Sequence, residues 1–142
     1  MSADARTIRS IAETLVVSGS TALSARPGAL TLSLIALRPN LLTLMGRGGL
    51  RTLVARALFL VSHRFPALWG VRTIDDGTLV GLEDACATLS DSEFDEVRLL
   101  FLTEILLLLL EFLGPGMTRA VISESWPHAP LDDIDLSQAR RS

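Results

Sequence analysis

The sequence of 142 residues predicts an all-α protein, an irregular or orthogonal bundle of five to seven helices around a central leucine-rich helix at about residues 91–113. Three observations predict this class. Apolar residues make up 49% of the chain and recur mainly at helical spacing. The longest apolar run is too long for a strand, and glycine and proline divide the rest into segments of helical length. Residues 1–127 are expected to form one helical domain and residues 128–142 an acidic, flexible tail.

The first third of the chain indicates helices separated by breaks. Residues 4–24 carry apolar side chains at helical spacing. Residues 29–37 form an apolar helix that is expected to end or kink at Pro39, because proline disfavours helical geometry in the residue before it. Asn40 would then cap a short helix over residues 41–46, which ends at the glycines around its last turn.

Residues 49–65 form the clearest amphipathic helix. Its polar face carries Thr52, Arg56 and His63. Phe59 lies beside that polar stripe, which indicates a second contact surface. The apolar face consists of Leu50, Leu53, Val54, Ala57, Leu58, Val61 and Phe65.

The segment between this helix and the leucine-rich run has a weaker pattern. Residues 67–78 are expected to form a connecting loop, with Trp69 and Val71 folded back on the core. Residues 78–89 are expected to form a short helix with its apolar side chains inward.

The predicted helix at 91–113 has clear signals at both ends. Ser90 and Glu93 have the spacing of a capping box, in which each side chain bonds the backbone N–H of the other. Gly114 provides a left-handed C-terminal position, and Pro115 prevents continuation of the helix. Residues 117–126 are expected to form a last short helix, which would pack Val121, Ile122 and Trp126 against the core.

The helix at 91–113 is apolar over about three-quarters of its circumference, which is typical of a central helix, a membrane helix or a helix shared between subunits. Its apolar run, residues 99–113, is shorter than the roughly 20 residues needed to cross a bilayer. Glu104 and Glu111 also interrupt it. We therefore expect no integral membrane segment, and the absence of a secretory signal pattern favours a cytoplasmic location.

Charge is distributed unevenly. Residues 1–66 contain eight arginines and two acidic residues, a net charge of +6, whereas residues 67–142 contain five arginines and 14 acidic residues, a net charge of −9. Such asymmetry favours packing of the two halves within one chain, pairing between two copies, or binding of an anionic partner.

No catalytic or metal-binding pattern stands out. A single cysteine and two histidines do not predict a metal site, and no cofactor is expected. His63 could act as a general base or haem ligand, but its position at a helix end favours contact with the last carbonyl groups. Arg47 and Arg51 flank a glycine-rich turn before a helix, which makes them candidate anion contacts.

These observations predict a non-enzymatic regulatory or interaction module that self-associates, as a homodimer, through apolar helix faces or binds another protein. The first alternative is a helical bundle that binds an apolar small molecule, a lipid or cofactor. The further alternative is a DNA-binding or membrane-associating protein, the former because residues 41–65 resemble a helix-turn-helix pattern. Candidate interface or ligand-contacting residues are Arg56, Phe59, His63, Arg98, Phe101, Glu104, Leu107 and Glu111.

Overall fold

The computed structural model describes residues 8–13, 26–74, 79–81, 84–85 and 87–125. This part of the chain is mostly helical, and its longest elements are α2 (Arg26–Ser62) and α4 (Asp91–Ser125). A short helical segment at residues 8–13 precedes α2. A five-residue 3₁₀ helix and a two-stranded sheet lie between α2 and α4. The predicted count of five to seven helices is not confirmed by these residues.

Both long helices are bent at a glycine. Gly46 divides α2 into a first limb, residues 26–45, and a second limb, residues 47–62, and it has φ +73° and ψ 177°. Gly114 divides α4 in the same way, with φ +82° and ψ 170°. These backbone angles lie in a region that residues other than glycine rarely adopt. The breaks predicted near residue 46 and at residue 114 are therefore confirmed.

The helix continues through Pro39, so the helix end predicted there as one alternative is wrong. Within α2 only Gly46 has non-helical backbone angles. Leu37 and Leu41, on either side of the proline, are both buried, and their burial offsets the hydrogen bond that proline cannot make. Asn40 also does not cap a helix; its Nδ2 donates a hydrogen bond of 3.0 Å to Ser125 Oγ near the end of α4.

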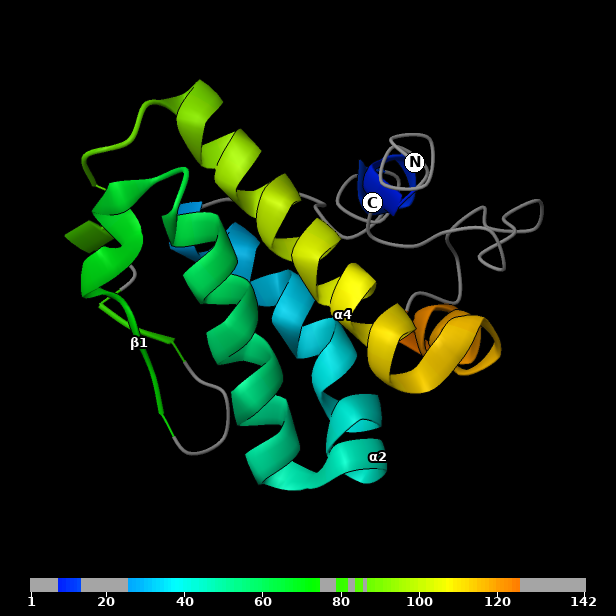
Figure 1. Ribbon diagram of the computed structural model, residues 1–142. Helices are drawn as coiled ribbons and strands as arrows, with labels where there is room; N and C mark the ends of the chain where they lie inside the picture. Colours follow the sequence, from blue (N-terminus) through cyan, green and yellow to red (C-terminus); the bar gives the residue numbers. More distant parts are fainter. Residues whose placement is uncertain (1–7, 14–25, 75–78, 82–83, 86, 126–142) are drawn as a thin grey trace.

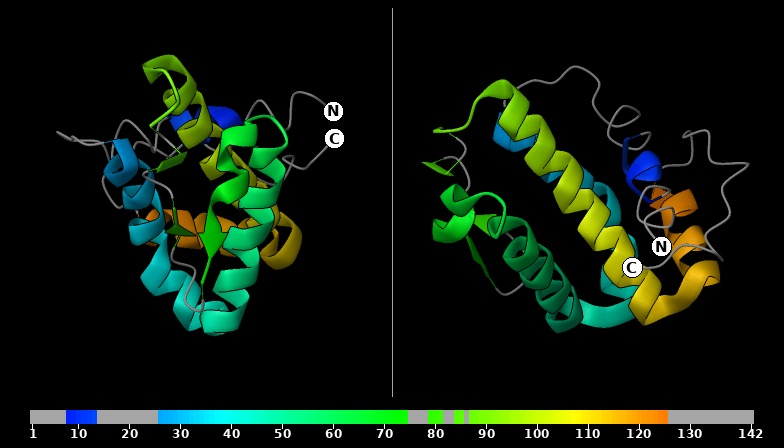
Figure 2. Two further views of the ribbon diagram at one scale, coloured as in Figure 1. Left: turned by 90° about the vertical axis from the view of Figure 1, so that its left-hand side faces the viewer. Right: turned by 45° about the horizontal axis from the view of Figure 1, so that its top comes forward.

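The start of α4 has the predicted capping box. The Ser90 backbone N–H donates to Glu93 Oε1 at 2.9 Å, and the Glu93 backbone N–H donates to Ser90 Oγ at 3.1 Å. Between Phe101 and Leu110 every residue except Glu104 is buried. The first limb of α4, residues 91–113, runs alongside the first limb of α2 (Figures 1 and 2), and α4 packs against α2. The apolar surplus of this helix is thus covered by the chain itself.

The second limb of α4 also follows the sequence pattern in part. Val121 and Ile122 are buried, as predicted. Trp126 and the acidic tail at residues 128–142 lie outside the described residues, as do most of the predicted first helix and Cys86.

The region after α2 differs most from prediction. A 3₁₀ helix, η1 (Pro66–Gly70), and strand β1 (Arg72–Thr73) replace the expected loop. Strand β2 (Leu79–Val80) pairs antiparallel with β1, with Arg72 opposite Val80. A helix beginning at residue 78 is therefore wrong. The physical reason is Gly81, whose φ of +89° is not helical and separates β2 from the helical residues 84 and 85. A β carbon at Gly81 would lie 3.2 Å from the Gly70 carbonyl oxygen, a close approach that favours glycine there.

An ion pair joins the basic and acidic halves of the chain. Arg9 Nη2 donates to Glu96 Oε1 at 2.8 Å, which fastens the helical segment 8–13 to α4. This hydrogen bond, together with the charge of Arg9, lowers the pKa of Glu96 below 4.5. The uneven charge along the chain is therefore used in part within one molecule.

We expect Glu96→Gln to lower the free energy of unfolding at pH 7 by about 0.5 kcal/mol, since the pair is partly exposed. Because the pKa of Glu96 is lower in the folded state, the pair stabilises the fold above pH 4.5 and ceases to do so as the pH falls through the folded pKa. Urea unfolding at pH 7 and at a pH below the folded pKa of Glu96 measures this. The difference in free energy of unfolding between variant and wild type should be smaller at the lower pH. Glu13→Gln is the control, because Glu13 lies 4.0 Å from Arg9 and is more exposed. Equal losses for the two variants would contradict this account.

Candidate interaction groove

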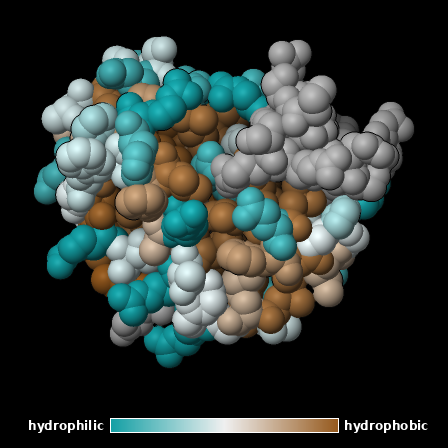
Figure 3. Space-filling model, viewed as in Figure 1, coloured by the Kyte–Doolittle hydropathy of each residue, from teal (hydrophilic) through white to brown (hydrophobic). Residues whose placement is uncertain are grey.

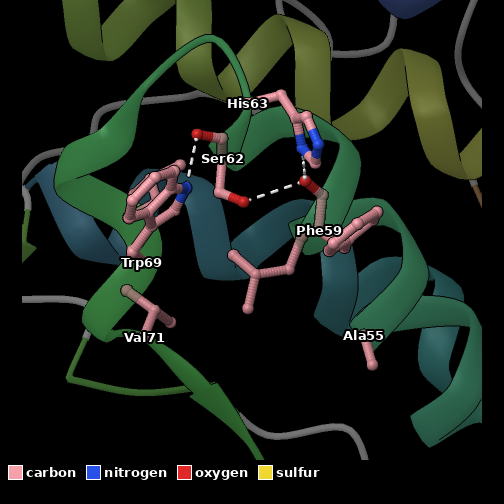
Figure 4. A pocket seen from close by; sticks show the side chains of 8 residues that line it. Ala55, Phe59, Ser62, His63, Trp69 and Val71 are labelled. Atoms are coloured by element: carbon pink, nitrogen blue, oxygen red, sulfur yellow. Dashed lines mark hydrogen bonds between the residues drawn. The ribbon is translucent and has the colours of Figure 1, made fainter.

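A hollow of about 500 Å³ opens between the second limb of α2 and η1. Phe59 and Ala55 lie on the α2 side, and Trp69 and Val71 face them from η1 and the residue that follows it (Figure 4). Leu58 and Leu68 are buried and form its floor. Ser62 and His63, at the end of α2, complete the lining. We call this hollow and its extension described below the aromatic groove.

The end of α2 holds the two aromatic rings of the groove in place. The Trp69 indole N–H donates to the Ser62 carbonyl oxygen at 2.9 Å. Ser62 Oγ and His63 Nδ1 both donate to the Phe59 carbonyl oxygen at 2.8 Å. The rings of Phe59 and His63 meet edge to face, with centroids 4.6 Å apart. Groove side chains therefore bond two carbonyl groups in the last turn of α2.

Both aromatic rings remain largely in contact with solvent. Phe59 is 54% exposed and Trp69 is 71% exposed. The prediction that Trp69 folds back on the core is wrong, because its hydrogen bond to Ser62 holds it against the helix end instead. Val71 does fold inward, as predicted, and is buried. Other apolar side chains also reach the surface between polar ones (Figure 3).

A second hollow of about 610 Å³ extends the groove along α2. It shares Ala55 and Phe59 with the first hollow and adds Gly48, Arg51, Thr52 and Arg56. These residues recur every three or four positions and so form one stripe along the helix. The lining of the two hollows includes arginine and histidine side chains but no acidic residue. The groove therefore combines an aromatic end with a basic end.

The structure brings together only some of the residues that the sequence singles out. Arg56, Phe59 and His63 lie in the aromatic groove, and Arg51 lies at its basic end. Arg47 is exposed and precedes Gly48, the first residue of the groove. The remaining candidates lie on α4 and line neither hollow: Arg98, Phe101, Glu104, Leu107 and Glu111.

The candidates on α4 have different environments. Phe101 and Leu107 are buried in the core. Arg98 is half-buried and its Nη2 donates to Asp95 Oδ1 at 3.2 Å, one turn earlier. Glu104 is half-buried and Glu111 is exposed. Buried side chains such as Phe101 and Leu107 contribute to stability.

Sequence reasoning missed Trp69 as a site residue. It also missed the other lining residues Gly48, Thr52, Ala55, Leu58, Ser62, Leu68 and Val71. A five-residue 3₁₀ helix is too short to show a periodic pattern, so the orientation of Trp69 could not be predicted. The available signal was Pro66 directly after the amphipathic helix, which indicates that the chain turns back beside it.

The lining of the groove is suited to binding. In the first hollow most side chains are apolar, and the polar groups of Ser62, His63 and Trp69 already bond carbonyl groups in the last turn of α2. Within the described residues, no group of three or more histidine, cysteine, aspartate or glutamate side chains could hold a metal ion. Across the same residues, none of the helices has a stretch both long and apolar enough to cross a bilayer.

No family model, curated protein or solved structure matches this chain.

Proposed function

We propose that this chain is a non-enzymatic protein–protein interaction module that self-associates through the aromatic groove. The observation that carries the proposal is the exposure of Phe59 and Trp69 on facing sides of one hollow. A hydrogen bond to the Ser62 carbonyl oxygen holds the Trp69 ring. On the opposite side of the hollow, His63 bonds the carbonyl oxygen of Phe59. We propose in addition that the protein has a regulatory role, that it is cytoplasmic and that its complete fold contains five to seven helices.

Exposed, held aromatic rings are the usual anchors of protein interfaces. Each aromatic side chain can bury about 150–250 Å² of surface. A ring that is already held in its bound orientation also loses little side-chain entropy on binding. Trp residues of this kind commonly contribute about 2 kcal/mol or more to the affinity of a complex. These properties favour a protein partner over a reaction at this site.

Self-association is supported by the charges of the groove and of the rest of the chain. The groove lies within residues 48–71 and is lined by basic but not acidic side chains. Residues 67–142 hold 14 of the 16 acidic residues. A second copy of the chain therefore offers acidic surface to the basic end of this groove.

We expect Trp69→Ala to weaken self-association about tenfold or more, because it removes the largest exposed apolar side chain of the groove. Sedimentation velocity over a range of protein concentrations measures the change. Phe112→Ala is the matched control, since Phe112 is an aromatic residue of α4 that is 62% exposed and lies outside the groove.

Circular dichroism should show unchanged helix content in both variants. An equal loss of self-association in Phe112→Ala and Trp69→Ala would contradict a specific role for the groove, and a monomeric wild-type protein would contradict self-association altogether.

A further inference from the structure

We infer that the occupant of the aromatic groove is the acidic segment at residues 131–136 of a second copy of this chain, and that two copies exchange these segments reciprocally. The inference rests on the proposed function and names the partner surface. The sequence of the segment is Leu-Asp-Asp-Ile-Asp-Leu. It combines three aspartates with three large apolar residues, which matches a groove with one aromatic and one basic part.

Arg56, at the basic end of the groove, is accessible to an incoming carboxylate. Arg56 is exposed and makes no hydrogen bond or ion pair with the described residues. None of the twelve residues that line the two hollows is acidic. Aspartates of an incoming segment would therefore meet Arg56 without first displacing a carboxylate from it, and Arg51, five residues earlier on α2, adds positive charge.

The dimensions of groove and segment agree. The stripe on α2 runs from Gly48 to His63, and 15 helical steps of about 1.5 Å give roughly 22 Å. Six extended residues span at most about 20–22 Å. The segment can therefore reach from the basic end of the groove to its aromatic end.

The surface of the stripe also permits close approach of a backbone. Gly48 and Ala55 present little or no side chain, and Thr52 Oγ1 donates to the Gly48 carbonyl oxygen within the helix. The apolar residues of the segment would pack on Phe59 and Trp69, at the end of the groove that is lined mainly by apolar side chains. This arrangement assigns Leu136 or Leu131 to the aromatic end, depending on the direction of the segment.

Reciprocal exchange determines the size of the assembly. Each chain carries this groove and one segment 131–136, so two copies that exchange these segments satisfy both contacts and leave neither open. The product is a dimer, and its affinity should fall as salt concentration rises because charged groups contribute to it.

Charge exchange in the full-length chain tests this inference. Arg56→Glu and Asp133→Arg should each weaken self-association about tenfold or more, as measured by sedimentation velocity. An equimolar mixture of the two variants should recover dimers, because one contact is then wild type and the other has both charges reversed. Glu124→Arg is the control, since Glu124 is an exposed acidic residue of α4 outside the segment, and it should leave the affinity unchanged.

The outcomes separate the inference from the proposed function. If Trp69→Ala weakens self-association but Asp133→Arg does not, the groove binds another part of the second copy, and the inference is overturned while the proposed function stands. If neither Trp69→Ala nor Arg56→Glu has an effect, both are overturned. Failure of the mixture to recover dimers, when each variant alone is monomeric and folded, overturns the inference.

Discussion

Phe101→Ala is expected to lower the free energy of unfolding by about 3–5 kcal/mol, the usual cost of removing a buried aromatic ring and leaving a cavity. Phe101 is 1% exposed and lies in the first limb of α4, among core residues of both long helices. Guanidinium unfolding at one fixed protein concentration measures the change as a lower midpoint at an unchanged slope.

Phe112→Ala is again the control, because it removes the same ring from the same helix at a position that is 62% exposed. Its expected effect is within about 0.5 kcal/mol. If Phe101→Ala fails to fold, Phe101→Leu should give a smaller but measurable loss. A loss of self-association with unchanged stability in Phe101→Ala would show that Phe101 is an interface residue, which would contradict its position in the core.

Replacing both bend glycines, Gly46 and Gly114, by alanine is expected to destabilise the protein by about 2–6 kcal/mol. Each site contributes about 1–3 kcal/mol, because a side chain is strained at positive φ with ψ near 180°, and distant sites add. Nothing lies within 4 Å of a β carbon built at either position, so the loss is conformational rather than steric. Thermal unfolding of the single and double variants measures it.

Gly116→Ala provides the comparison within the same bend. A β carbon at Gly116 also meets nothing within 4 Å, but the backbone there is helical. Alanine at this position is expected to be neutral or to stabilise the fold by about 0.4–1 kcal/mol. Equal effects of Gly114→Ala and Gly116→Ala would show that the bend at Gly114 carries no conformational requirement for glycine.

The position of Phe101 changes how the apolar excess of this chain is understood. From sequence, a helix apolar on most of its surface is equally consistent with burial in the core and with burial against another subunit. In the structure, α2 packs against α4. Aromatic residues remain exposed in the groove on α2 and η1, at Phe59 and Trp69, and outside it at Phe112.

The predicted site residues that prove to lie together all come from one helix. Arg56, Phe59 and His63 share one stripe of residues 49–65, and helical periodicity alone places them on a common face. The candidates on α4 were chosen by the same periodicity, but which face of that helix is covered depends on its neighbours. Helical periodicity therefore identified residues on the α2 side of the groove, but it could not identify those on the η1 side.

Several features of this protein were determined by sequence alone because their causes are local. The capping box at Ser90 and Glu93 requires only residues three positions apart. The bends at Gly46 and Gly114 require only the conformational freedom of glycine. The amphipathic pattern of residues 49–65 likewise follows from spacing along one helix.

Other features were decided only by tertiary structure, because their causes are contacts between distant residues. Helix α2 passes through Pro39 because burial of Leu37 and Leu41 outweighs a local preference to break. Trp69 remains exposed because its indole bonds a carbonyl group at the end of α2. The groove exists because η1 turns back beside that helix, an arrangement that depends on long-range packing and that no periodic pattern encodes.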